Sequence, residues 1–214
     1  MAVLNLSNRK SVFLFLELMI LLALPVLNLN LLYLILVLII TSGTKFLTNE
    51  RFSDYGFFRP AFISLLTAAA IGITYGLADN LFIEPAISKI THQEVDLGDY
   101  AKVKGNLPAF LGLLALGWIV GGLFEEFFFR GYLFNRIRHF ITNSAAYRIT
   151  AIGLTSIIFA LAHSYQGITG IADTFIFAVI MGLLYFYFRK NIWCLILVHG
   201  FFDTVGITMI FLGY

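Results

Sequence analysis

Long apolar runs, separated by short polar connections, are the feature that most constrains this chain. Of its 214 residues, 60% are hydrophobic and only 12% are charged, whereas soluble domains have about 45–50% and about 25%. A water-soluble domain cannot bury so much apolar surface, so the composition predicts a protein that crosses a membrane several times.

The apolar runs lack the strict apolar–polar alternation that indicates a β-barrel. Helices satisfy their backbone hydrogen bonds within one segment, so we expect an all-α, polytopic transmembrane helix bundle. No polar stretch is long enough to form a second domain, which makes residues 1–214 one membrane-embedded domain. Cys194 is the single cysteine, so an intrachain disulfide is excluded.

The N-terminal apolar region allows two interpretations. Pro25, Asn28 and Asn30 interrupt it, which fits either one long kinked helix or a hairpin of two short helices, 11–24 and 31–40. The later spans are expected near residues 61–83, 107–128, 149–163, 171–188 and 192–212.

The distribution of Lys and Arg favours the hairpin, because cytoplasmic loops carry an excess of these residues. A single first helix would place nine of the 14 on the inside and five on the outside. The hairpin places only Lys89, Lys102 and Lys104 outside and the other eleven inside. These eleven are Arg9, Lys10, Lys45, Arg51, Arg59, Arg130, Arg136, Arg138, Arg148, Arg189 and Lys190. We therefore expect about seven membrane helices with a cytoplasmic N-terminus.

The same analysis describes the two charged segments. The basic group Arg130–Arg148 is attributed to positive-inside topology rather than to nucleic-acid binding, so the lipid bilayer is the expected partner. The longest polar piece, 84–106, is expected to be a solvated outer loop with room for a short surface helix. The chain is thus interpreted as a multi-pass protein of the cell membrane.

A few ionisable residues lie inside the apolar spans. Glu125 and Glu126 belong to the fourth span, and Arg130 follows just after its expected end. His163 lies in the fifth span, and His199 and Asp203 lie in the seventh. A charged group at the centre of a membrane helix costs roughly 2.5–3.5 kcal/mol, so such groups usually face a protein interior or a watery cavity and mark a functional site.

Helical spacing predicts their depth. If the turn between the fourth and fifth spans centres near Asn143, Glu125 and His163 are nearly level, with a mismatch of about 3 Å. His199 and Asp203 are four residues apart and share one helix face. The spacing Gly117-x-x-x-Gly121 allows another helix to approach the fourth span closely.

The two adjacent glutamates are expected to have different partners. They lie about 100° apart around a helix, so we expect only one of them to face a given cavity. Arg130 follows Glu126 at i+4 and is its natural ion-pair partner, which leaves Glu125 for chemistry. A membrane-embedded His can be a simple interhelical hydrogen bonder, and a Glu pair can extend toward the interface. Convergence of these groups from three helices favours a catalytic site.

Three motifs carry a resemblance to a known family. Glu125-Glu126-Phe127-Phe128-Phe129-Arg130 matches EExxxR, Phe159-Ala160-Leu161-Ala162-His163 matches FxxxH, and His199-Gly200-Phe201-Phe202-Asp203 matches HxxxN/D. In this order they resemble the CPBP family of intramembrane proteases (CAAX protease and bacteriocin-processing enzymes, also called Abi). The resemblance covers about half of the chain and implies a catalytic core in 107–212, with N-terminal helices and an outer loop in 1–106.

The resemblance implies an endopeptidase in which Glu125 and His163 activate a water molecule. His199 and Asp203 would stabilise the oxyanion, and Glu126 and Arg130 would support the site. An ionised Asp can only accept hydrogen bonds, so Asp203 must be protonated, orient His199 or bind a cation. The implied substrate is a peptide or protein, either a prenylated CaaX tail or a bacteriocin leader, cleaved near the cytoplasmic leaflet.

Two mechanisms and three functions are open from the sequence. A metal-free glutamate mechanism without a cofactor is favoured because the HExxH pattern is missing. The alternative is zinc held by Glu125, His163, His199 and Asp203. A transporter or proton relay would also use intramembrane Glu and His, but the inverted repeats and broken helices typical of transporters are not seen. A non-catalytic immunity or scaffold protein is the third possibility.

Overall fold

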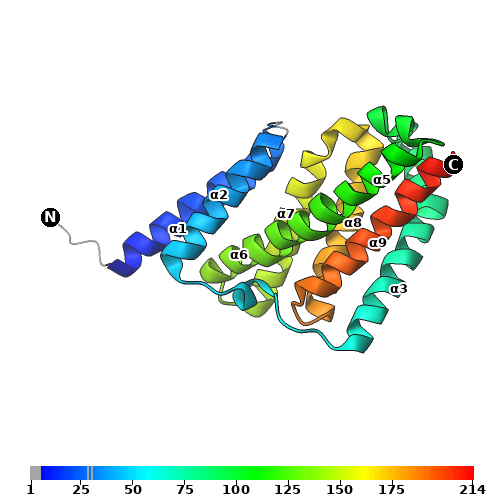
Figure 1. Cartoon of the computed structure of the whole chain (residues 1–214). Coiled ribbons are helices and arrows are strands. Elements are labelled where there is room, and N and C mark those ends of the chain that lie inside the picture. Colours follow the sequence, from blue (N-terminus) through cyan, green and yellow to red (C-terminus); the bar gives the residue numbers. More distant parts are fainter. Residues whose placement is uncertain (1–5, 28, 30) are drawn as a thin grey trace.

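The computed structural model describes residues 6–27, 29 and 31–214, and over these residues it is helical without a strand (Figure 1). This confirms the all-α prediction. Asn28 and Asn30, on which the hairpin prediction partly rested, lie outside the described residues, as do residues 1–5 and the side chain of Arg9.

The N-terminal region is a pair of helices rather than one kinked helix. α1 (Leu6–Ala23) ends in the 3₁₀ turn η1 (Leu24–Val26), where Pro25 lies in the first turn, and α2 (Leu31–Thr48) follows. Glu17 of α1 and Thr44 of α2 line one surface hollow, and the two helices run antiparallel in Figure 1. Figure 1 shows this hairpin at one side of the bundle.

The main bundle follows the hairpin in chain order. After the 3₁₀ turn η2 (Phe52–Tyr55), helix α3 (Phe62–Ala78) continues through a π turn, η3 (Asp79–Ile83), into α4 (Glu84–Thr91). The 3₁₀ segment η4 (Gly98–Val103) leads to one long helix made of α5 (Leu107–Leu116), η5 (Gly117–Leu133) and α6 (Phe134–Phe140). The chain ends with α7 (Ser144–Ala162), η6 (Ser164–Gln166), α8 (Gly167–Tyr187) and α9 (Ile192–Leu212).

Five helices within the described residues are long and apolar enough to cross a membrane. They are Phe62–Thr91, Leu107–Phe140, Ser144–Ala162, Ser164–Tyr187 and Ile192–Leu212. The segment Leu32–Thr48 of α2 is apolar but shorter. The chain is thus a multi-pass membrane protein, whereas the count of seven spans stays a prediction.

The prediction for residues 84–106 is wrong at the start of this segment. Residues 84–91 continue the third span as α4 instead of forming a separate surface helix. Pro85 cannot donate a backbone hydrogen bond, and the π turn that precedes it lets the helix continue past this residue.

Asparagine side chains start three of the membrane helices. The side-chain oxygen of Asn143 accepts hydrogen bonds from the backbone N–H groups of Ala145 and Ala146 at the start of α7. Asn106 and Asn191 cap α5 and α9 in the same way. These caps satisfy donors that a helix start leaves unpaired, and the turn predicted near Asn143 is confirmed.

Helix α9 lies between α3 and η5, and glycines allow the close approach on both sides. A Cβ added at Gly72 of α3 would lie 2.5 Å from the carbonyl oxygen of Val198, and one at Gly121 of η5 would lie 2.6 Å from Asp203 Oδ2. Small residues at such contacts let helix backbones pack tightly in a membrane.

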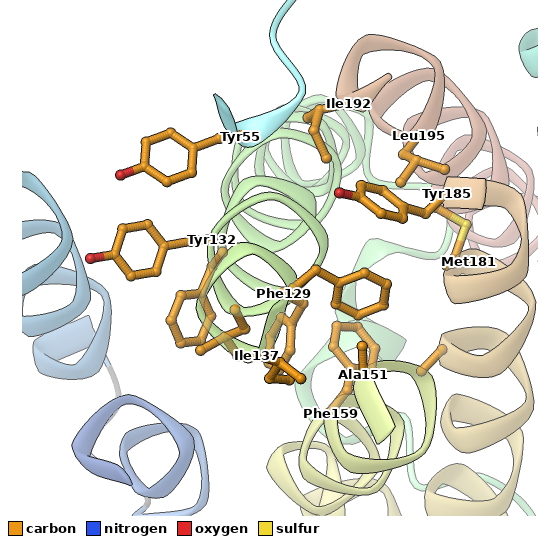
Figure 2. Close-up of a cluster of buried hydrophobic side chains, with 14 of the residues drawn as sticks. Tyr55, Phe129, Tyr132, Ile137, Ala151, Phe159, Met181, Tyr185, Ile192 and Leu195 are labelled. Atoms are coloured by element: carbon orange, nitrogen blue, oxygen red, sulfur yellow. The ribbon is translucent and has the colours of Figure 1, made fainter. Parts of the chain in front are cut away.

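Aromatic side chains fill the interior between η5, α7, α8 and α9 (Figure 2). Phe129 of η5 packs edge-on against Phe159 of α7, with ring centroids 4.9 Å apart, and Phe134 packs against Tyr185 of α8 at the same distance. Edge-to-face pairs add about 0.5–1.5 kcal/mol each beyond area burial. This cluster fixes α7 and α8 against the helix that carries the two glutamates.

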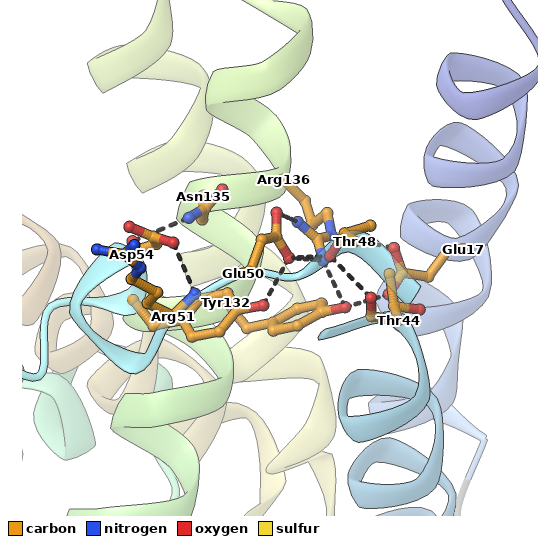
Figure 3. A network of polar contacts seen from close by, with 10 residues as sticks. Glu17, Thr44, Thr48, Glu50, Arg51, Asp54, Tyr132, Asn135 and Arg136 are labelled. Atoms are coloured by element: carbon orange, nitrogen blue, oxygen red, sulfur yellow. Dashed lines mark hydrogen bonds and ion pairs between the residues drawn. The ribbon is translucent and has the colours of Figure 1, made fainter. Parts of the chain in front are cut away.

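A second, polar cluster attaches the α1–α2 hairpin to the bundle (Figure 3). Arg136 of α6 is buried and donates to Glu17 of α1 at 3.0 Å. Its other two guanidinium nitrogens donate to the two carboxylate oxygens of Glu50 at 2.7 Å each. Tyr132 accepts from Arg136 at 2.8 Å and donates to Glu17.

This cluster corrects part of the charge analysis. Arg136 was assigned to a basic cytoplasmic loop, but it is 1% exposed and neutralised by two carboxylates. Burial alone would raise the pKa of Glu50, yet hydrogen bonds from Arg136, Tyr55 and Thr48 outweigh it and lower that pKa to about 2. Glu50 is therefore ionised at neutral pH and holds the arginine by two parallel bonds.

We predict that Arg136→Met strongly destabilises the protein. The substitution leaves Glu17 buried without its cation, and breaking a buried ion pair in this way costs about 3–5 kcal/mol. Reversible unfolding in mixed detergent micelles measures the loss. Arg148→Met removes an exposed arginine one helix away and is the control; equal stability of the two variants would contradict the role of the cluster.

Candidate active site

The two adjacent glutamates lie in η5, where the long fourth helix has π-type winding. Segments of this type are rare and occur often at functional sites. Tyr33 of α2 packs edge-on against Phe124, with ring centroids 6.0 Å apart, and covers this part of the helix from the hairpin side.

Glu126 connects an arginine to a histidine. Arg130 Nη1 donates to Glu126 Oε1 at 2.7 Å, which confirms the predicted i+4 ion pair. The same oxygen lies 2.7 Å from Nδ1 of His199, so that nitrogen carries a proton and donates it. Arg130 also donates to the carbonyl oxygen of Ala178 at 3.2 Å. Glu126 and Arg130 are both buried and carry opposite charges.

The other ring nitrogen of His199 faces two further carboxylates. Nε2 lies 4.0 Å from Glu125 Oε2 and 3.6 Å from Asp203 Oδ1. Both separations exceed a hydrogen bond but keep the charges within an ion-pair distance. The imidazole thus presents its two nitrogens to the two glutamates, and the expectation that only one of them faces a given cavity stays a prediction.

Glycines of η5 make room for this arrangement. A Cβ at Gly117 would lie 3.1 Å from Asp203 Oδ2, and one at Gly121 would lie 3.1 Å from His199 Nε2. The Gly117-x-x-x-Gly121 spacing thus places the backbone of η5 directly against the polar face of α9, as the sequence predicted for a close helix approach.

His163 ends α7 and is fixed by its own helix. Its Nδ1 lies 2.8 Å from the carbonyl oxygen of Phe159, so this nitrogen donates and the lone pair is on Nε2. Its ring lies 4.7 Å from that of Phe159. Over the described residues, no hydrogen bond or ion pair joins His163 directly to Glu125. The FxxxH spacing acts here through the backbone oxygen of Phe159 as well as through its ring.

A cavity of about 490 Å³ adjoins these groups. His163, His199 and Asp203 line it, together with Phe159 and Phe177. Glu125 is not among the described residues that form the wall. A group bound in the cavity would meet both imidazoles first.

The cavity extends to the end of the bundle that carries segment 84–106. Glu84, Leu97 and Tyr214 belong to its wall and also to an adjoining surface hollow. The basic loops lie at the opposite end, because Arg59, Arg148 and Arg189 lie near the other ends of the same helices. Cleavage near the cytoplasmic leaflet therefore conflicts with the topology predicted from those same basic residues.

Zinc held by the four candidate ligands is the alternative to a metal-free site. Within the described part of the chain, no group of three or more His, Cys, Asp or Glu side chains is placed to hold a metal ion. The choice between zinc held by Glu125, His163, His199 and Asp203 and a metal-free mechanism stays a prediction.

Sequence reasoning missed two features of the site. The carbonyl groups of Phe159 and Ala178 orient His163 and Arg130, and backbone groups leave no trace in a side-chain motif. The cavity wall also contains Asp79 and Asp173. These are acidic residues inside predicted spans, which is a signal that could have identified them.

Residues 107–205 match the family model described as Type II CAAX prenyl endopeptidase Rce1-like. This segment is a little under half of the chain and is similar to the Rce1-like family. It contains all six polar residues described above, from Glu125 to Asp203. No curated protein and no solved structure matches the chain significantly. The match confirms the resemblance drawn from the three motifs and supports a membrane protease.

The close packing at Gly121 leads to a prediction that needs no knowledge of the substrate. Gly121→Ala places a methyl group against Asp203 and His199, and such overpacking costs about 1–3 kcal/mol. Gly112→Ala is the matched control, since a Cβ there meets nothing within 4 Å, and it should be neutral or stabilising. Unfolding in detergent micelles compares them; equal effects would contradict the packing described here.

Proposed function

We propose that this chain is an intramembrane endopeptidase that uses a water molecule activated by glutamate and histidine. The observation that carries the proposal is the arrangement of Glu125 and Asp203 around Nε2 of His199, beside a cavity that His163 also lines. The Rce1-like family supports the protease class. The roles of the individual residues are our inference.

In the proposed reaction, Glu125 accepts a proton from water, with His163 Nε2 as a second acceptor beside the cavity. The water oxygen forms a bond to the peptide carbonyl carbon, and the carbonyl oxygen takes the negative charge. The C–N bond then breaks, and the leaving nitrogen receives the proton that Glu125 had taken. General acid–base catalysis of this type contributes about 10²–10⁴-fold.

His199 is proposed to stabilise the oxyanion. Glu125, Glu126 and Asp203 surround its ring at 2.7–4.0 Å and favour the protonated imidazole, which donates from Nε2. Asp203 is placed to support that charge, which resolves the difficulty that an ionised Asp cannot donate to an oxyanion. Glu126 and Arg130 position His199 and do not touch the substrate.

The substrate is proposed to be a peptide segment that reaches the cavity in an extended form. The family description names CAAX prenyl endopeptidases, so a prenylated tail is one candidate, and a bacteriocin leader peptide is the other. We propose no metal cofactor for the reaction.

The test compares Glu125→Gln and His163→Ala with the parent protein in lipid nanodiscs, using peptide mixtures analysed by mass spectrometry. Each substitution should reduce cleavage at least 100-fold. Both variants must keep the unfolding stability and the cavity packing of the parent protein. Full cleavage by both variants would refute the proposal, whereas loss of activity with a zinc chelator and its recovery with zinc would favour the metal mechanism.

We also propose an orientation, with the N-terminus and the basic loops in the cytoplasm and α1 and α2 as two further spans of the cell membrane. The cavity then opens on the opposite side. Cysteines at positions 59 and 104 in a Cys194→Ala background report it, since both positions are exposed whereas Cys194 is buried.

A membrane-impermeant maleimide added to intact cells should label the variant Lys104→Cys. Arg59→Cys should react only after the membrane is opened. The reverse labelling pattern would overturn the orientation and would place the cavity mouth at the cytoplasmic face.

A further inference from the structure

The catalytic cavity has a second polar end, away from His199. Asp79 of η3 and Asp173 of α8 line it there, with Glu84 nearer the surface. Asp79 is 3% exposed, and its Oδ1 has no hydrogen-bond partner among the described residues. Asp173 Oδ1 is likewise buried and unpartnered within that part of the chain.

A phenol oxygen belongs to the same group. Tyr75 Oη, one turn before Asp79 on the same continuous helix, is buried and without a hydrogen-bond partner among the described residues. The Tyr75 ring packs on Phe177 at 6.1 Å and on Phe202 at 5.0 Å, and both of these residues line the cavity. Buried polar atoms without partners are costly, and a concentration of them needs an explanation.

The charged side chains that line this end of the cavity are all acidic. Asp79, Glu84, Asp173 and Asp203 line the cavity, and none of its described wall residues is Lys or Arg. Two imidazoles, His163 and His199, are engaged with Phe159 and Glu126 at the other end. A cationic group bound between the aspartates would satisfy their oxygens, and the surrounding aromatic rings would also favour it.

We infer that this end of the cavity is a subsite for a basic side chain of the peptide substrate, an Arg guanidinium or a Lys ammonium. The inference rests on the proposed protease function. The subsite is defined by Tyr75, Asp79 and Asp173, and Glu84 lies toward the mouth, where its charge attracts a cationic peptide.

The position of the subsite favours a substrate side chain over an inorganic ion. A Cβ at Gly76 would contact Val205, and one at Gly206 would lie 3.7 Å from the Asn80 side chain. Asp79 is therefore level with the part of α9 just past Asp203, on the order of 5–10 Å from His199 along the helix axis. Two residues of extended peptide span about 7 Å, so the basic residue lies within two positions of the cleaved bond.

The experiment uses the full chain in lipid nanodiscs and a synthetic peptide mixture in which every residue type occurs at every position. Mass spectrometry of the cleaved sites should reveal a preference for Arg or Lys at one position near the bond. Replacing that Arg by citrulline, which has nearly the same shape without the charge, should slow cleavage about 10- to 100-fold.

Asp79→Asn and Asp173→Asn should each remove the difference between the cleavage rates of the Arg and citrulline peptides. Asp96→Asn is the control. Asp96 is exposed at the same end of the bundle, and its carboxylate accepts a hydrogen bond from the backbone N–H of Gly98. Thermal unfolding of all variants checks that the fold is retained.

Several results would overturn the subsite. The subsite is refuted if the parent protein shows no preference for basic residues. It is also refuted if both Asn variants keep that preference. If NaCl stabilises the protein against thermal unfolding more than choline chloride does, and Asp79→Asn removes this difference, the aspartates bind an inorganic cation instead.

A separate measurement distinguishes failure of the protease proposal from failure of the subsite. If no peptide is cleaved in a Glu125-dependent way, binding of fluorescent Arg and citrulline peptides to the Glu125→Gln protein still reports the subsite. Tighter binding of the Arg peptide that Asp79→Asn abolishes would support it, and equal binding would refute it.

Discussion

The hydrogen bond between Glu126 and His199 is the interaction on which the rest of the site depends. It joins η5 to α9 in the interior of a bundle whose exterior is apolar, where neither group can be left unpaired. Arg130 balances the carboxylate and is itself fixed to the carbonyl oxygen of Ala178 on α8. Three helices are therefore held in one register by a single polar chain, and this register directs Nε2 of His199 toward Glu125, Asp203 and the cavity.

The remaining packing protects that register. Glycines on α3 and η5 bring both helices against α9, and Trp118 of η5 also lies against Gly200 of α9. The indole of Trp118 also donates to Thr204 at 3.1 Å. Outside this core, Arg136 attaches the α1–α2 hairpin through Glu17 and Glu50. Apolar contacts set how close the helices come, whereas the buried ion pairs select one alignment among those that apolar surfaces would tolerate.

The sequence predicted those parts of the structure that depend on local spacing. The Glu126–Arg130 pair and the close approach at Gly121 follow from spacing within one helix, and the helical class follows from the long apolar runs. It failed where distant segments meet. The burial of Arg136 depends on Glu17, 119 residues away, and the contact of both glutamates with His199 depends on how α9 rotates against a π-wound helix. Neither is encoded by spacing within one span.

The proposed mechanism requires that a water molecule from the cavity reaches Glu125 beside Nε2 of His199. An experimental structure in a lipid nanodisc, at a resolution that shows ordered water, tests it most directly. The account predicts a water within hydrogen-bond distance of both Glu125 Oε2 and His199 Nε2, continuous with the space beside His163. A lipid tail or apolar side chain between these two atoms, or a Glu125 carboxylate turned toward the bilayer, would contradict it.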